Sequence, residues 1–258
     1  MYTIYNEDCL FTMDRLSDDS IDLVVTSPPY DDLRTYNTSS SWNVSIFENI
    51  VRKLFTKVSD GGVVVWIVSD AMIDGSESGN SFRQALFFIE CGFKLHDTMI
   101  WRKNNFSNPS KNRYHQTFEY MFVFVKNKIK TFNPIMDRKN IYSGKIGSYG
   151  ENTVTQVDGS KKVRPRKVNT EYGMRHNVWD ALTSGQNGES KKYKHPAMFP
   201  VDLVNDHIMS WSNENDLVFD PFMGSGTVGV ACEKLNRNFV GSEIDETYFQ
   251  IAKQRLEE

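Results

Sequence analysis

The sequence has 258 residues, 39% of them hydrophobic, and its 30 Lys and Arg against 33 Asp and Glu give a formal net charge of −3. This composition argues against wholesale disorder, and no apolar run approaches the roughly 20 residues of a membrane span, so no membrane association is expected. The three cysteines (Cys9, Cys91 and Cys232) are isolated, and the first residues do not resemble a signal peptide, which favours a cytoplasmic protein with neither a disulfide framework nor a metal site.

Short apolar runs typical of strands alternate with segments of helical spacing along the first part of the chain. Pro28 and Pro29 end the apolar run at 21–26, and Gly61 and Gly62 are expected to break the chain before the run at 63–68. The expected strands cover residues 2–5, 21–26, 63–68, 95–101 and 119–125, the last two as a possible hairpin with a long loop. The expected helices cover residues 11–16, 46–58 and 81–89, the last ending before Gly92.

Periodicity fades over residues 127–195, where Gly, Ser, Asn, Lys and Arg predominate, and returns after Pro196. Two further strands are expected at 217–219 and 239–241, with helices at 201–211, 227–235 and 246–256. Strands alternating with helices predict a doubly wound α/β fold with a mainly parallel sheet, an antiparallel hairpin element and a loop-rich basic insertion. The expected parts are residues 1–126, the insertion 127–195, and residues 196–258.

The net charge hides a strong asymmetry. Residues 1–101 carry 7 basic and 15 acidic residues, residues 102–195 carry 19 and 7, and residues 196–258 carry 4 and 11. A basic middle between acidic flanks indicates a polyanionic partner. The basic residues singled out as phosphate contacts are Lys161, Lys162, Arg164, Arg166, Lys167, Lys191, Lys192 and Lys194.

A glycine loop, Pro221–Gly226, joins the strand ending at Asp220 to the next helix, and the following strand ends at Glu243. In nucleotide-binding βαβ units the glycines admit the ligand, and an acid at the tip of the second strand binds ribose hydroxyls. GSGTVG matches the dinucleotide pattern in letters, but the carboxylate of Asp220 disfavours a pyrophosphate and favours a cationic ligand. This charge pattern favours S-adenosylmethionine over NAD.

The segment Thr26-Ser-Pro-Pro-Tyr30 follows another expected strand, where ligands bind in open α/β sheets. The prolines make a stiff turn, Ser27 adds a hydroxyl, and Tyr30 adds an aromatic face, so the segment suits a base with an exocyclic amino group.

TSPPY, followed by HPAMFP, DPFMGSGT and GSEID in this order, resembles the β class of DNA amino methyltransferases, a circularly permuted Rossmann-like family. The resemblance covers nearly the whole chain except residues 127–175, where the family has its variable target-recognition region. It implies a catalytic half (1–126), a target-recognition region (127–195) and a cofactor-binding half (196–258). It also implies methyl transfer from S-adenosylmethionine to an amino nitrogen of a flipped base in DNA.

The resemblance assigns roles residue by residue. The catalytic residues are Ser27, Pro28, Pro29 and Tyr30. The cofactor-binding residues are Asp8, His195, Phe199, Pro200, Asp220, Pro221, Phe222, Gly224, Gly226, Thr227, Glu243 and Asp245.

Ser-Pro-Pro-Tyr resembles mostly the N4-cytosine enzymes, with N6-adenine as the alternative. An NAD-dependent oxidoreductase and a DNA-binding protein without catalysis are less favoured, because the first leaves TSPPY unexplained and the second leaves a full set of matched site residues without a role. Methylation of cytosine at carbon 5 requires a cysteine nucleophile, which follows a proline in the enzymes of that family. No Pro-Cys pair occurs in this sequence, so that reaction is disfavoured. The expected partner is DNA; a cognate restriction endonuclease, and a monomeric or homodimeric state, are compatible with the resemblance.

Overall fold

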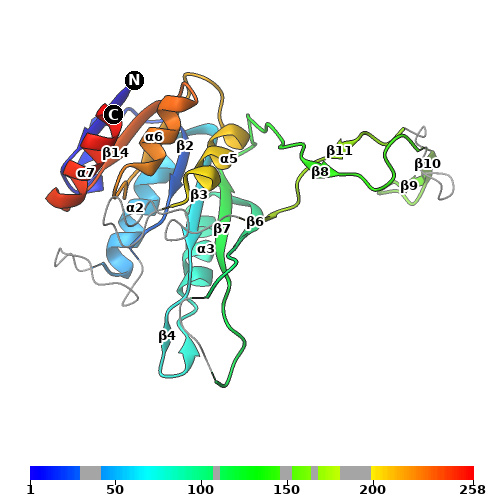
Figure 1. The fold of residues 1–258 in the computed structure, drawn as a ribbon, viewed down its shortest axis with the longest axis horizontal. Coiled ribbons are helices and arrows are strands. Elements are labelled where there is room, and N and C mark those ends of the chain that lie inside the picture. Colours follow the sequence, from blue (N-terminus) through cyan, green and yellow to red (C-terminus); the bar gives the residue numbers. More distant parts are fainter. Residues whose placement is uncertain (30–41, 107–110, 146–152, 164–167, 181–198) are drawn as a thin grey trace. The chain divides into compact units, whose positions relative to one another are not determined.

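The computed structural model describes residues 1–29, 42–106, 111–145, 153–163, 168–180 and 199–258, which form two compact units (Figure 1). The larger unit contains Met1–Asn133 and Asn177–Glu258, and the smaller contains Pro134–His176. Within the described ranges, no helix has both the length and the apolar character needed to cross a membrane.

The larger unit is built on an eight-stranded sheet with the order β1-β14-β13-β2-β3-β7-β6-β12. Neighbouring strands are parallel except around β7, which is antiparallel to both β3 and β6. The strands are β1 (Tyr2–Tyr5), β2 (Ile21–Thr26), β3 (Val58–Val68), β6 (Lys94–Arg102), β7 (Phe118–Val125), β12 (Val178–Asp180), β13 (Leu217–Asp220) and β14 (Asn238–Ser242). The predicted mainly parallel α/β sheet with an antiparallel hairpin is therefore confirmed.

Helices cover both faces of this sheet (Figure 1). Alternate strand residues such as Val24, Val64 and Trp66 share one apolar core with α1, α2 and α3. The residues between them, such as Val25 and Val65, are also fully buried, which is why these strands are apolar throughout rather than alternating. The helices are α1 (Cys9–Arg15), α2 (Val44–Lys57), α3 (Asn80–Glu90), α5 (Val201–Trp211), α6 (Thr227–Lys234) and α7 (Glu246–Glu257).

The centre of the sheet brings together strands from opposite ends of the chain. Val218 and Phe219 of β13 pair with Leu23 and Val24 of β2. On one side of this pair the sheet continues to β14 and β1, and on the other side to β3. Ligands of open α/β sheets bind at the carboxyl ends of strands where the strand order reverses in this way. The segments after β2 and β13 are therefore neighbours at the expected site.

Two local expectations differ from the structure. Gly61 and Gly62 do not separate a helix from a strand, because β3 begins at Val58 and runs through them, with an irregular register opposite β2. Gly61 has φ +76°, and an added Cβ would lie 2.7 Å from the Lys128 carbonyl oxygen. A glycine is therefore required here, where the strand is irregular and another backbone segment packs closely against it. Strand β12 was not expected; its Trp179 is buried, and the strand lies parallel to β6 at the sheet edge.

Among its described residues, the smaller unit contains loops and two short antiparallel ribbons. Strand β9 (Thr153–Thr155) pairs with β10 (Lys161–Val163), and β8 (Arg138–Lys139) pairs with β11 (Tyr172–Gly173). This unit spans a narrower range than the expected insertion at 127–195, because residues 127–133 and 177–180 belong to the larger unit.

Candidate active site at the ends of strands β2 and β13

Ser27 follows directly on β2, at the carboxyl end of the central strand pair. Its Oγ is buried and has no hydrogen-bond partner among the described residues. A buried hydroxyl without a partner costs about 1–3 kcal/mol, and natural structures rarely leave one unpaired without a reason. This atom is therefore a free hydrogen-bonding position at the site.

A short hydrogen bond joins the two central strands just below this tip. Thr26 Oγ1 donates to Asp220 Oδ1 at 2.6 Å, and the backbone N–H of Phe222 donates to the same oxygen at 3.0 Å. Asp220 is 2% exposed, and burial raises the pKa of its carboxyl from the ordinary 3.8 to about 7, against the opposing effect of these two hydrogen bonds. The Asp220 carboxyl thus ties the glycine loop to the strand that carries Ser27, and it resists ionisation.

The glycine loop is held from two sides. The Gly224 N–H donates to Glu243 Oε2 at 2.9 Å, so the acid at the end of β14 fixes one side of the loop. On the other side, Nη1 of Arg255 in α7 donates to the Ser225 carbonyl at 2.7 Å and to the hydroxyls of Ser225 and Thr227 at 3.1 Å each. Arg255 is 7% exposed, so it is a buried support of the loop.

Gly226 turns the loop into α6. Its φ of +78° favours glycine, and an added Cβ would lie 2.9 Å from the Cβ of Ala252 in α7. The glycine therefore meets both a conformational and a packing requirement.

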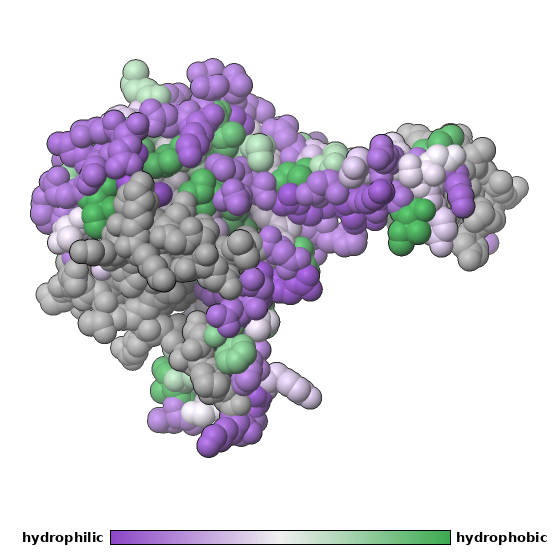
Figure 2. Space-filling view, in the orientation of Figure 1, coloured by the Kyte–Doolittle hydropathy of each residue, from purple (hydrophilic) through white to green (hydrophobic). Residues whose placement is uncertain are grey.

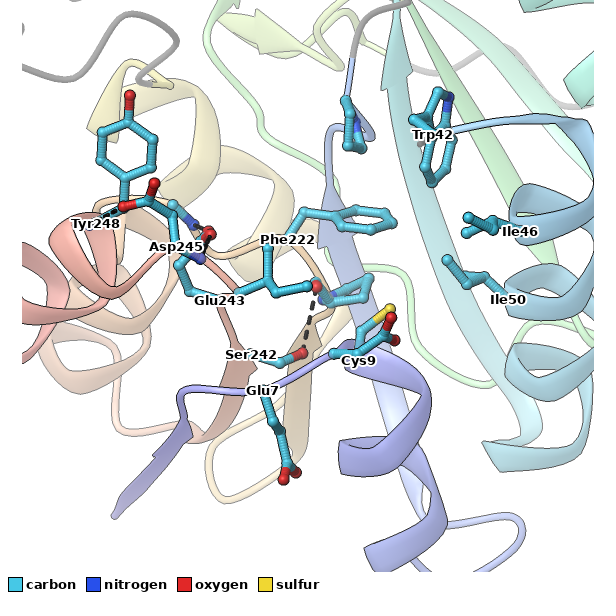
Figure 3. A pocket seen from close by; sticks show the side chains of 15 residues that line it. Glu7, Cys9, Trp42, Ile46, Ile50, Phe222, Ser242, Glu243, Asp245 and Tyr248 are labelled. Atoms are coloured by element: carbon cyan, nitrogen blue, oxygen red, sulfur yellow. Dashed lines mark hydrogen bonds between the residues drawn. The ribbon is translucent and has the colours of Figure 1, made fainter. Parts of the chain in front are cut away.

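Beside this loop lies a pocket with one apolar and one acidic wall (Figure 3). In the apolar wall, the ring of Phe222 points toward α2 and makes an edge contact with Trp42, with ring centroids 5.5 Å apart. Ile46 and Ile50 of α2 complete that wall. The pocket has about 880 Å³ of empty space, including its part open to solvent, which suits a nucleoside-sized ligand.

The acidic wall comes from the carboxyl ends of β1 and β14. It is formed by Glu7, Asp8, Glu243 and Asp245. Two of these carboxylates also begin helices: Asp8 accepts from the Leu10 N–H at 2.8 Å, and Asp245 from the Tyr248 N–H at 3.0 Å. Burial raises the pKa of Glu243, whose Oε1 accepts from the Asp245 N–H at 2.8 Å. A ligand with hydroxyls and positive charge matches this wall.

The structure brings many of the predicted site residues together, but not all. Those that line the pocket are Asp8, Pro29, Pro221, Phe222, Gly224, Glu243 and Asp245. Asp220, Gly226 and Thr227 shape the loop without lining the pocket, and Phe199 and Pro200 precede α5, also outside the pocket lining. The predicted residues outside the described part of the chain are Tyr30, Arg164, Arg166, Lys167, Lys191, Lys192, Lys194 and His195.

Sequence reasoning missed two groups at this site. Trp42, Ile46 and Ile50 supply the apolar wall; the spacing of Ile46 and Ile50 indicated only a helix, and Trp42 precedes that helix. Arg255 lies in the closing helix, where a lone arginine gives no sign of a contact with a loop 30 residues earlier.

Comparison with known proteins agrees with this arrangement. Residues 21–254 match the sequence profile of the DNA methylase family that covers N6 and N4 enzymes. The chain belongs to this family, which sets aside the oxidoreductase alternative.

Particular relatives extend over nearly the full chain. The orphan methyltransferase M.BamHII of Bacillus amyloliquefaciens is 50% identical over 248 residues, covering 94% of this chain and 91% of the relative. The crystal structure of the M1.HpyAVI–SAM complex is similar with a TM-score of 0.65 and 29% identity, covering 99% of each chain. The PvuII DNA methyltransferase (cytosine-N4-specific) shares the fold, with a TM-score of 0.72 at 22% identity over 98% of this chain and 86% of that one.

Proposed function

We propose that this DNA methyltransferase transfers a methyl group from S-adenosylmethionine to the exocyclic N4 of a cytosine flipped out of duplex DNA. The observation that carries the catalytic assignment is the buried Ser27 Oγ, which lacks a partner among the described residues at the tip of β2. The choice of cytosine rests on the Ser-Pro-Pro-Tyr sequence, which resembles mostly the N4-cytosine enzymes.

The pocket beside the glycine loop fits S-adenosylmethionine by its chemistry. Phe222, Trp42 and the two isoleucines of α2 offer apolar surface to a flat base, and Glu243 offers carboxylate oxygens to ribose hydroxyls. The acidic wall favours the positive charges of the sulfonium and ammonium groups. M1.HpyAVI, a relative of similar fold, was crystallised with the same cofactor.

When bound, S-adenosylmethionine supplies an electrophilic methyl group. The exocyclic amine of cytosine is a weak nucleophile, because its lone pair is delocalised into the ring. Ser27 Oγ and the carbonyl of Pro28 act as acceptors for the amino protons, which draws the nitrogen toward tetrahedral geometry and accommodates the positive charge that develops there. Tyr30, outside the described residues, is assigned the stacking contact with the flipped base.

The central strands keep these groups in place during the reaction. The Thr26–Asp220 hydrogen bond couples Ser27 to the glycine loop, so that the acceptor and the cofactor pocket keep a fixed relation. No covalent enzyme intermediate is needed, since the amine would form its bond to the methyl carbon as the bond from that carbon to sulfur breaks, and the methylated nitrogen would then release one proton to water. Phosphate contacts are assigned to the basic residues of the middle region, of which Lys161 and Lys162 lie on β10 in the smaller unit.

The Ser27→Ala variant tests the assignment. We expect it to lose methyl transfer to DNA by about 100-fold or more, as for removal of a transition-state hydrogen-bonding group, while binding of S-adenosylmethionine is unchanged. The assay follows tritiated methyl incorporation into DNA, and mass spectrometry of the nucleosides identifies the product. Ser45→Ala, at an exposed position on α2, is the matched control and should keep full activity.

Two outcomes would contradict the proposal. Unchanged activity in Ser27→Ala would remove the catalytic role of this hydroxyl. N6-methyladenine as the product of the wild-type enzyme would keep the reaction type and overturn the choice of cytosine.

A further inference from the structure

Two segments project from the larger unit as a single arm. We define the arm as residues 69–79, which contain the ribbon of β4 (Met72–Ile73) and β5 (Ser76–Glu77), together with residues 103–106 and 111–117 of the loop between β6 and β7. In Figure 1, β4 marks this projection, which extends beyond the end of the sheet.

The base of the arm is fixed by hydrogen bonds. The Ser78 N–H donates to the Ala71 carbonyl at 2.8 Å and closes the ribbon. Asp70, which is 5% exposed, accepts from the Ser78 hydroxyl at 3.0 Å and from the N–H of Ser81 at the start of α3, also at 3.0 Å. The ribbon is therefore built onto the body of the unit.

Hydrogen bonds also join the two segments of the arm. Arg113 donates to the Gly75 carbonyl at the tip of the ribbon and contacts Met72 Sδ at 3.0 Å. Gln116 donates to the Ser69 hydroxyl at 3.2 Å. The loop is held against the ribbon at Arg113 and Gln116, the residues on either side of Tyr114 and His115.

The arm exposes large apolar and aromatic side chains. Tyr114 is fully exposed, and Met72 and Ile73 are 41% and 49% exposed. Phe106 packs on His115, with ring centroids 4.0 Å apart, and is still 39% exposed. In Figure 2, apolar surface shows on the projection that carries β4 in Figure 1. Such side chains on a projection indicate a surface for another molecule.

The arm leaves the sheet on the side where the carboxyl ends of the parallel strands lie, which is also the side that carries Ser27. Strands β2 and β3 are parallel, and β6 runs in the same direction because both β3 and β6 are antiparallel to β7. The arm follows the carboxyl ends of β3 and β6, just as Ser27 follows the carboxyl end of β2. The arm and the candidate catalytic residue therefore both lie at the carboxyl ends of the parallel strands.

We propose that the arm is a wedge that enters duplex DNA beside the target base, with Tyr114 as the inserting side chain. This inference rests on the proposed function, since only a base that must leave the helix needs such help. Flipping a base sacrifices its stacking, and an aromatic ring inserted between base steps replaces part of that contact.

The charge around Tyr114 suits this role. Of the four cations in residues 102–118, Arg102 and Lys103 are ion-paired with Asp180 and Glu119, whereas Lys111 and Arg113 are exposed beside Tyr114. The ribbon carries Asp74 and Glu77, so the phosphate contacts are assigned to the loop side of the arm. Duplex DNA is the partner that matches an aromatic tip flanked by cations.

The test compares two DNA substrates that contain the sequence methylated by the wild-type enzyme. In one the target base is correctly paired; in the other it is mispaired and already poorly stacked. We expect Tyr114→Ala to lower kcat/KM on the paired duplex by roughly ten-fold or more, within the range of losing one base–aromatic stack. On the mispaired duplex we expect activity within about three-fold of wild type, since extrusion there is easier.

Two further variants serve as controls. Tyr114→Phe should keep wild-type behaviour, because the ring and not the hydroxyl carries the effect. Tyr2→Ala removes another exposed tyrosine, at the opposite end of the parallel strands, and should show no difference between the substrates.

Full activity of Tyr114→Ala on the paired duplex, or an equal loss on both duplexes, would overturn the wedge while leaving the proposed function intact. If no DNA sequence is found that the wild-type enzyme methylates, the proposed function and the wedge are overturned together.

Discussion

Replacing Asp220 by asparagine tests the electrostatics of the site, because the buried carboxyl resists ionisation. The amide keeps an oxygen for Thr26 and for the Phe222 N–H, which donate at 2.6 and 3.0 Å, so the local structure is expected to persist. The change removes the ability to become charged and replaces Oδ2 by an amide nitrogen of similar size.

The sign of the effect follows from the direction of the pKa shift. Burial raises the Asp220 pKa from 3.8 to about 7, so between these values the folded protein holds a proton that the unfolded chain has lost. The contribution of Asp220 to wild-type stability therefore falls as pH rises from about 4 to 7, and the loss is complete above pH 7. About three pKa units at about 1.4 kcal/mol each set an upper limit of about 4 kcal/mol.

Urea unfolding of wild type and Asp220→Asn without cofactor measures this difference. We expect the variant to be more stable at pH 8, and its advantage over wild type to grow by up to about 3 kcal/mol between pH 5 and pH 8. Calorimetric titration with S-adenosylmethionine at pH 8 should show weaker binding to the variant, because a negative charge near a cationic ligand is lost.

A stability difference between the two proteins that is the same at pH 5 and pH 8 would show that the Asp220 pKa is not raised in the folded protein. Unchanged affinity for S-adenosylmethionine would show that the charge of Asp220 does not attract the cofactor, and would leave the stability prediction untouched. Asp74→Asn, at an exposed position with φ +49°, which asparagine tolerates, is the control and should change neither quantity.

Three other changes test the loop and the DNA contacts. Arg255→Ala removes three hydrogen bonds to the glycine loop and should raise the Kd for S-adenosylmethionine roughly ten-fold with DNA affinity unchanged, whereas Lys253→Ala on the exposed side of α7 should alter neither. Gly226→Ala forces an alanine to φ +78° against Ala252 and should lower the unfolding free energy by at least about 1–2 kcal/mol, measured in urea; an unaltered midpoint would contradict the close contact. The double variant Lys161→Ala, Lys162→Ala should reduce the slope of log Kd against log salt for DNA by roughly 2, and an unchanged slope would remove these lysines from the phosphate contacts.

The sequence predicted the elements whose patterns are local and long enough to read. The runs at 21–26 and 201–211 match β2 and α5 residue for residue, because β-branched residues and the prolines that follow mark the first as a short strand, and helical spacing over 11 residues marks the second. Strand β12 has only three residues, and its place depends on pairing with β6 about 80 residues away, which no local pattern encodes.

The part of the candidate site that lies within one continuous stretch of sequence could be predicted, because its pattern is local. Asp220, Gly224 and Glu243 lie in one βαβ unit, whose spacing shows that they meet. The dependence of Asp220 on Thr26, nearly 200 residues earlier, and of the loop on Arg255 arises from strand order and helix packing. Such contacts follow only from the folded arrangement.

The central claim is methylation of cytosine N4 in DNA, and single-molecule sequencing of DNA from a host that expresses the protein tests it most directly. We expect N4-methylcytosine at one recurring sequence, and its absence from the DNA of a host that expresses Ser27→Ala. DNA without a new methyl mark, or with N6-methyladenine or 5-methylcytosine in its place, would contradict methylation of cytosine N4.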